Sequence, residues 1–127
     1  MRGRTHEQDL ATMEPGPAAE MAKTHPDTIV GIKTAHYGAP DWGPVERAVQ
    51  AGEAAGLPVM VDFGDDFPER PLATLLTEKL RPGDIYTHCY SGRRQELGPD
   101  GRPNPGMVEG RTRGVIFDVG HGAGSFY

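Results

Sequence analysis

The sequence lacks most features of secreted, membrane and nucleic-acid-binding proteins. Cys89 is its single cysteine, so the chain has no internal disulfide and fits a reducing compartment, and we predict a small buried thiol there. No apolar run approaches the roughly 18 residues of a membrane span. The residues 1–9 include no apolar stretch of the kind found in secretory signals. The cytoplasm is therefore the default compartment.

Positive charge is also scarce. The chain carries 13 Lys and Arg against 18 Asp and Glu, a formal net charge of −5, so nothing predicts a surface that neutralises nucleic-acid phosphates. The densest basic patch, Arg93 and Arg94, is interpreted as part of a solvated loop. Four other residues are interpreted as structural, the first two packed and the last two on the surface: Tyr37, Trp42, His6 and His25.

Glycine and proline are abundant instead, with 18 and 12 copies spread among short apolar runs. Four of these runs are β-branched and apolar, as strands buried on both faces should be: 28–33, 58–63, 84–88 and 114–119. Helical patterns with apolar residues on one face lie before, between and after them: 16–24, 41–55, 71–80 and 105–112. The stretch 91–106 has the composition of a long loop.

Strands that alternate with helices predict an α/β protein with a parallel sheet. Two architectures remain open at this point: an open doubly wound sheet, or part of a (β/α)8 TIM barrel with about four βα units. A whole barrel needs about 250 residues, so four units would make about half of one.

Chemically active side chains stand at the C-terminal end of each predicted strand. In chain order they are Lys33 with His36, Asp62, His88, and Asp118 with His121. Parallel α/β folds build their sites at this end of the strands. The repetition at four successive strand ends therefore favours a functional site over four separate structural residues.

Lys33 is the least ordinary of these residues, because it sits within an apolar strand pattern. It could be a salt-bridge partner, a Schiff-base nucleophile, or a lysine that takes up CO2 as a carbamate and bridges two metal ions. His88 suits a neutral imidazole ligand for zinc. Asp62 could coordinate a metal or orient a neighbouring ligand.

A glycine-rich segment, 119–125, allows a second interpretation of the function. Backbone N–H groups of the 120–125 loop could cradle a phosphate, which predicts a small α/β domain that binds a phosphorylated metabolite. Lys33 would then be a Schiff-base or salt-bridge lysine. The glycines could otherwise let the chain pass close to a substrate, with His121 pointing inward.

Four segments, 30–37, 58–64, 80–88 and 113–122, together resemble the amidohydrolase/deacetylase family of metallohydrolases, part of the amidohydrolase superfamily and related to dihydroorotases. The resemblance covers about residues 8–127. It implies a (β/α)8 barrel that holds one or two divalent metals, usually zinc. It also implies hydrolysis of an amide, cyclic amide or ester of a small molecule, often with removal of an acetyl group.

The same resemblance implies roles for individual residues. Lys33 would be the carboxylated lysine that bridges the metals, and His88 would be a histidine ligand, so these two are the predicted catalytic residues. Asp62 would complete the predicted metal ligands. His121 and His36 are predicted to lie at the substrate.

The sequence departs from the family pattern in two respects. Asp62 stands where many relatives have a fifth-strand histidine ligand, and no His-x-His pair occurs. We therefore expect a fragment with an incomplete site, in which residues 1–15 lead into the barrel. Residues 16–127 would form its central part, from about the fourth to the seventh strand. Homo-oligomerisation is left open.

Overall fold

The computed structural model describes residues 6–120 and has an α/β fold built on one parallel sheet. The strands, in sheet order, are β1 (Ile32–Thr34), β2 (Val59–Val61), β3 (Ile85–Tyr86) and β4 (Ile116–Phe117). The helices are α1 (Pro15–Thr24), α2 (Gly43–Ala55), α3 (Leu72–Thr74) and α4 (Pro105–Arg113). Two 3-10 turns, η1 (His6–Gln8) and η2 (Leu10–Thr12), precede α1, and a π-helical turn, η3 (Leu75–Lys79), continues α3. The predicted α/β class and parallel strand pairing are confirmed.

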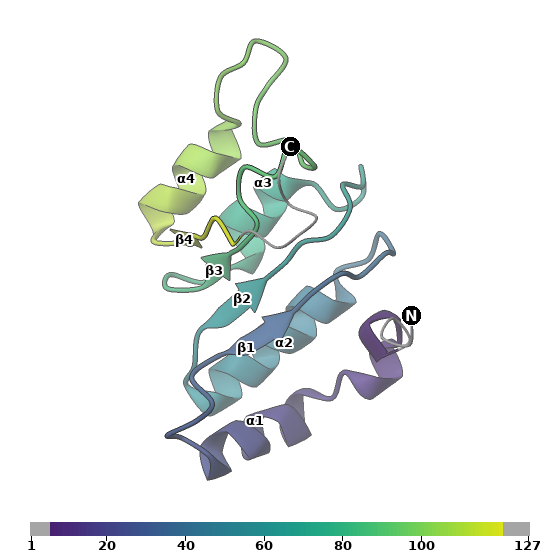
Figure 1. The fold of residues 1–127 in the computed structure, drawn as a ribbon, viewed down its shortest axis with the longest axis vertical. Helices are drawn as coiled ribbons and strands as arrows, with labels where there is room; N and C mark the ends of the chain where they lie inside the picture. The colour runs from purple at the N-terminus through teal and green to yellow at the C-terminus, as the bar shows by residue number, and fades with distance from the viewer. Residues whose placement is uncertain (1–5, 121–127) are drawn as a thin grey trace.

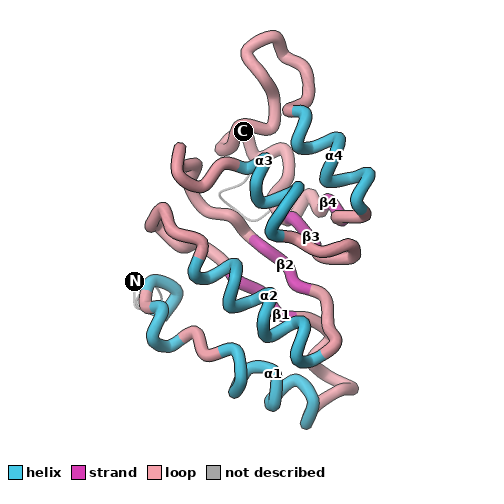
Figure 2. Tube along the Cα trace, turned by 180° about the vertical axis from the view of Figure 1, so that it is seen from behind, coloured by secondary structure: helices cyan, strands magenta, loops and turns pink. Residues whose placement is uncertain are grey.

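The helices form a layer on one face of the sheet. Figures 1 and 2 show α2, α3 and α4 on the same side of the strands, with α1 beside α2. None of the helices within residues 6–120 has the length and hydropathy needed to cross a membrane.

The core lies between this helical layer and the sheet. Val59 and Val61 of β2 are fully buried and face the helices, whereas Met60 between them points to the opposite face and is only partly buried. Strand pairing aligns Met60 with Lys33 on one side and Ile85 on the other, and Ile85 in turn pairs with Ile116. These four residues form a row across the face that no helix of the described chain covers.

The helix boundaries follow from local sequence. Proline occupies the first turn of α1, α2 and α4, where its missing N–H costs no hydrogen bond. Gly56 and Gly114 end α2 and α4 with φ angles of 70° and 97°, a left-handed conformation that favours glycine. The helix predicted over 71–80 is present as α3 and η3, and both turns bury their leucines.

The first strand is shorter than the predicted 28–33. The Ile29 N–H donates to the His25 carbonyl as part of a turn, and Val30 is 75% exposed. Pairing with β2 begins only at Ile32. The apolar run therefore includes residues that lead into the strand but do not belong to it.

Asp84 links β2 to the turn before β3, at the end of the sheet where the strands begin. Its buried carboxylate accepts hydrogen bonds from the Val59 N–H at 2.8 Å, and from the backbone N–H and the guanidinium of Arg81 at 2.8–2.9 Å. Burial by itself would raise the pKa of Asp84, but the hydrogen bonds from Arg81 and Val59 outweigh it and hold the pKa below its ordinary value. Asp84 is therefore a charged structural residue.

Candidate functional site

Asp62, in the segment that follows β2, is the centre of the candidate site. The Oδ2 atom of its buried carboxylate lies 3.1 Å from His36 Nε2 and 3.5 Å from His88 Nε2. Its Oδ1 atom lies 2.8 Å from Arg94 Nη2. The structure therefore brings together three of the predicted site residues, His36, Asp62 and His88, and adds Arg94.

Both histidines have a left-handed backbone conformation. His36 and His88 each have a φ of 58°, in the segments that follow β1 and β3, and Tyr90 has a φ of 67°. Few residues other than glycine adopt this conformation, and histidine, asparagine and aspartate are enriched among those that do. At each histidine the chain turns away from its strand. This turn places the imidazole beside Asp62.

The prediction that Arg94 belongs to a solvated loop is wrong, because its side chain is only 3% exposed. Nearby in the same loop, Glu96 is also buried and accepts hydrogen bonds from the Tyr86 hydroxyl at 2.7 Å and from the Tyr90 N–H at 2.8 Å. Burial is the main reason that the pKa of Tyr86 is raised. The buried side chains of Arg94 and Glu96 therefore hold the loop after β3 against β3 and the segment after β2.

The N-terminal segment, residues 6–13, adds a second carboxylate to the site. Glu7 of η1 lies 3.3 Å from His36 Nδ1, so His36 stands between two acidic side chains. The Gln8 side chain donates to the His36 carbonyl at 2.7 Å and accepts from the Gly38 N–H at 2.9 Å. These contacts hold the loop after β1 in place.

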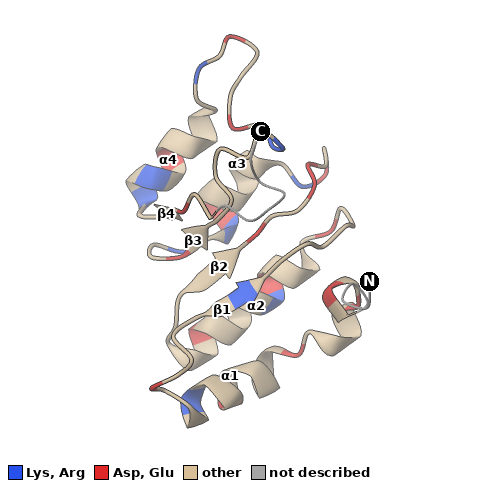
Figure 3. Cartoon of the chain, viewed as in Figure 1, with Lys and Arg blue, Asp and Glu red and all other residues tan. Residues whose placement is uncertain are grey.

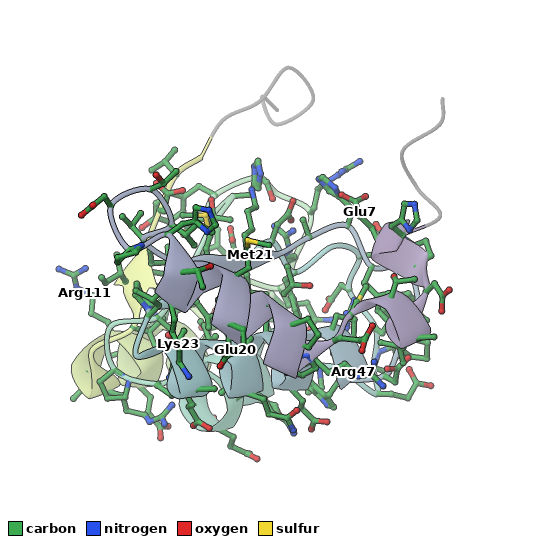
Figure 4. All side chains as sticks on the ribbon, turned by 90° about the horizontal axis from the view of Figure 1, so that it is seen from below. Glu7, Glu20, Met21, Lys23, Arg47 and Arg111 are labelled. Carbon is green, nitrogen blue, oxygen red and sulfur yellow. The ribbon has the colours of Figure 1, made fainter. Side chains whose placement is uncertain are left out.

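Arg47 anchors this segment to α2. Its guanidinium donates to the carbonyls of Leu10, the first residue of η2, and Met13, the residue after that turn. Figure 4 shows Glu7 and Arg47 at the same end of the molecule. The segment is therefore a structured part of the site's surroundings.

Lys33 lines a cleft of about 700 Å³ between the N-terminal segment and the β1–α2 unit. Glu7 and His36 also line this cleft. Figure 3 shows the basic position on β1, where Lys33 is the only charged residue. Within the described residues Lys33 is exposed, and no hydrogen bond or ion pair joins it to Asp62 or His88.

The end of β4 contributes Asp118, whose Oδ2 accepts a hydrogen bond from the Thr87 hydroxyl. The Asp118 carbonyl accepts from the Cys89 N–H at 3.1 Å, so the ends of β3 and β4 are linked. His121, predicted at the substrate, lies outside the described residues. So does the glycine-rich 120–125 loop apart from Gly120.

The donor types at Asp62 suit zinc, and so do two of the distances. With zinc–ligand bonds of about 2.0–2.2 Å, neighbouring ligands of a tetrahedral site lie about 3.3 Å apart. The separations from Asp62 Oδ2 to the two Nε2 atoms, 3.1 and 3.5 Å, bracket this value. Within residues 6–120, however, no three His, Cys, Asp or Glu side chains are arranged to hold one ion together. The geometry therefore suits zinc for two pairs of donors, Asp62 with His36 and Asp62 with His88.

Comparison with known proteins finds relatives that are all named deacetylases. No protein-family model matches the chain. A deacetylase of Enterococcus faecalis is 30% identical over 125 residues, a match that covers 93% of this chain and 33% of that protein. The chain is a distant homologue of proteins named deacetylases.

Two further relatives carry the same name. A deacetylase of Brucella anthropi is 27% identical over 124 residues, covering 94% of this chain and 30% of that protein. A deacetylase of Agrobacterium fabrum is 30% identical over 103 residues, covering 77% of this chain and 25% of that protein. The chain thus spans a quarter to a third of the length of the curated relatives it matches.

Cys89 adjoins His88 but is structural, as predicted. The thiol is fully buried, and burial, with a smaller contribution from the Glu96 carboxylate, raises the pKa of Cys89 to about 11. We expect Cys89 to react with a thiol reagent at pH 8 at least about 100-fold more slowly in the folded protein than in the unfolded chain, because both thiolate fraction and access are reduced. Stopped-flow labelling with and without denaturant measures the ratio, and equal rates would contradict burial.

Proposed function

We propose that the chain belongs to a zinc-dependent hydrolase that removes acetyl groups from small molecules bearing an amide or ester. The observation that supports this most directly is the convergence of two imidazoles on one carboxylate oxygen, at 3.1 and 3.5 Å, at the ends of parallel strands. The names of the three curated relatives point to the same reaction class.

We also propose that the sheet is part of a (β/α)8 barrel. The strands follow one another in sequence order within the sheet, and the helices lie on one face of it. A doubly wound sheet carries helices on both faces, whereas a barrel turns its other face inward. In that arrangement the row that contains Lys33, Met60 and Ile116 would face the barrel interior.

Asp62 and His88 would hold the metal. Asp62 would do so through Oδ2, which already faces His88 Nε2. Lys33, exposed and without an ion pair to the described residues, would join them after its neutral amine adds to CO2 and loses a proton to form a carbamate. When bound, zinc would lower the pKa of a water molecule and polarise the substrate carbonyl.

His36 would act at the substrate or as a further donor. Its Nε2 faces Asp62 and its Nδ1 faces Glu7, so its ring orientation is fixed from both sides. The cleft that His36 shares with Lys33 could admit a small acylated compound. His36 would thus bind the substrate from the β1 side, and the metal ligands would come from β1 and from the segments after β2 and β3.

Metal removal tests this proposal. The purified protein is treated with a chelator, dialysed and reloaded with zinc, and acetate release from N-acetyl and O-acetyl compounds is measured at each stage. We expect acetate release to require zinc. In His88→Asn it should fall by at least about 100-fold, because one zinc ligand is lost. The surface variant His25→Asn is the control. Acetate release that survives chelation, or zinc binding unchanged in His88→Asn, would rule out the proposed metal chemistry.

A further inference from the structure

Arg94 makes the best-buried ionic contact of the site. Its guanidinium lies 2.8 Å from Asp62 Oδ1, and the two side chains are 3% and 6% exposed. Exposed ion pairs contribute little to structure, but a buried pair fixes its partners because separating them leaves an unpaired charge. The Asp62 carboxylate is therefore held by Arg94 more firmly than by either histidine.

The contact divides the two oxygens of Asp62 between different partners. Oδ1 faces Arg94 and, at 3.4 Å, the Gly64 N–H. Oδ2 faces the two imidazoles. Because the carboxylate is planar, fixing Oδ1 also fixes the direction in which Oδ2 points.

The remaining donors of Arg94 connect the two loops that carry the site. Its Nε donates to the Gly64 carbonyl at 3.1 Å, and its Nη1 donates to the His88 carbonyl at 3.4 Å and to Ser91 Oγ at 3.3 Å. The guanidinium thus spans the segment after β2 and the segment after β3. Lysine, with one ammonium group, could not reach these acceptors together.

We propose that Arg94 is the positioning residue of the site: it holds Asp62 so that a single oxygen is presented to His36 and His88, and it sets the distance between the two loops. The metal-binding consequence rests on the proposed function, whereas the orientation of Asp62 does not. In that function Arg94 would make Asp62 a one-oxygen ligand. It would also offset the negative charge that this residue brings to the site.

The experiment uses five variants of the protein, including the double variant Asp62→Asn/Arg94→Met, and two readouts. Arg94→Met removes the guanidinium. Arg94→Lys keeps the positive charge but loses the forked arrangement of N–H donors, and Asp62→Asn removes the carboxylate charge. Arg102→Met, at an arginine of the same loop whose side chain is 85% exposed, is the matched control. The first readout, on metal-free protein at one fixed pH, is the nitrogen NMR shifts of the two imidazole rings. The second is the zinc dissociation constant, measured by competition with a coloured chelator.

We expect Arg94→Met and Asp62→Asn to shift the Nε2 resonances of both His36 and His88, while Arg102→Met leaves them in place. Zinc affinity should fall about 10- to 100-fold in Arg94→Met, as is usual when the partner of a metal ligand is removed. Arg94→Lys should lose about 10-fold, at the lower end of that range. In the Asp62→Asn background, adding Arg94→Met should cost less than about 2-fold, because its effect runs through Asp62.

Several results would overturn the proposal. Folded Arg94→Met protein with the imidazole resonances of the original protein would do so, as would an equal loss of zinc affinity with and without Asp62. If Arg94→Met does not fold, Arg94→Lys decides: original resonances in that variant contradict the proposal. If the original protein binds no zinc but the resonances move as expected, the positioning role stands and the proposed metal-dependent function fails.

Discussion

Asp62→Asn is expected to reduce zinc-dependent acetate release by at least about 100-fold, since it removes the one group that contacts both imidazoles. The same change should lower the free energy of unfolding by about 3–5 kcal/mol, because it leaves the buried Arg94 guanidinium without its carboxylate. Enzyme assay and urea unfolding measure the two effects on the same sample.

Asp65→Asn is the matched control, because Asp65 lies three residues along the same segment and its side chain is exposed. It should change stability by less than about 0.5 kcal/mol, as surface substitutions usually do. An Asp62→Asn protein with the original activity would show that Asp62 has no part in the reaction. An unchanged free energy of unfolding would show that the ion pair with Arg94 contributes nothing to the fold.

Asp84→Asn should lower the free energy of unfolding by about 3–5 kcal/mol, as much as Asp62→Asn, because Asp84 is 1% exposed and a neutral amide cannot accept all the hydrogen bonds from Val59 and Arg81. The amide N–H2 group would instead face one of these donors. Chemical unfolding at pH 7 measures the loss. Asp100→Asn, at an exposed position in the loop after β3, is the control.

The effect of Asp84 depends on pH in a defined direction. Because its folded pKa is lowered from 3.8, its stabilising contribution is fully present above that value and is lost as the pH falls through the folded pKa. The difference in free energy of unfolding between the original protein and Asp84→Asn should therefore shrink below about pH 4. A difference that stays constant down to pH 2 would contradict a lowered pKa.

Elements of the fold could be predicted where the signal is local. The sequence predicts a helix over residues 105–112, and α4 covers Pro105–Arg113, with Pro105 in its first turn and Gly114 at its end. The four strand positions followed from apolar runs between turn residues. Strand length could not be predicted, because Val30 belongs to the same apolar run as Ile32 but has no strand to pair with.

The candidate site could be predicted in part. His36, Asp62 and His88 were expected to meet because they follow parallel strands, and the structure brings them together. Arg94 could not be found this way, since its partner Asp62 is 32 residues away and a loop arginine beside another arginine has the pattern of a solvated segment. Glu7 was missed for the same reason, because its contact with His36 crosses 29 residues.

The left-handed backbone at His36 and His88 decides how these residues should be mutated. Alanine, the usual choice, would remove the ring and place an unsuited residue at a φ of 58°, so any loss of function would mix chemistry with loop distortion. Asparagine tolerates that conformation and lacks the imidazole. Substitution libraries at these two positions should therefore be built around asparagine, aspartate and glycine, and alanine scanning would overstate their chemical role.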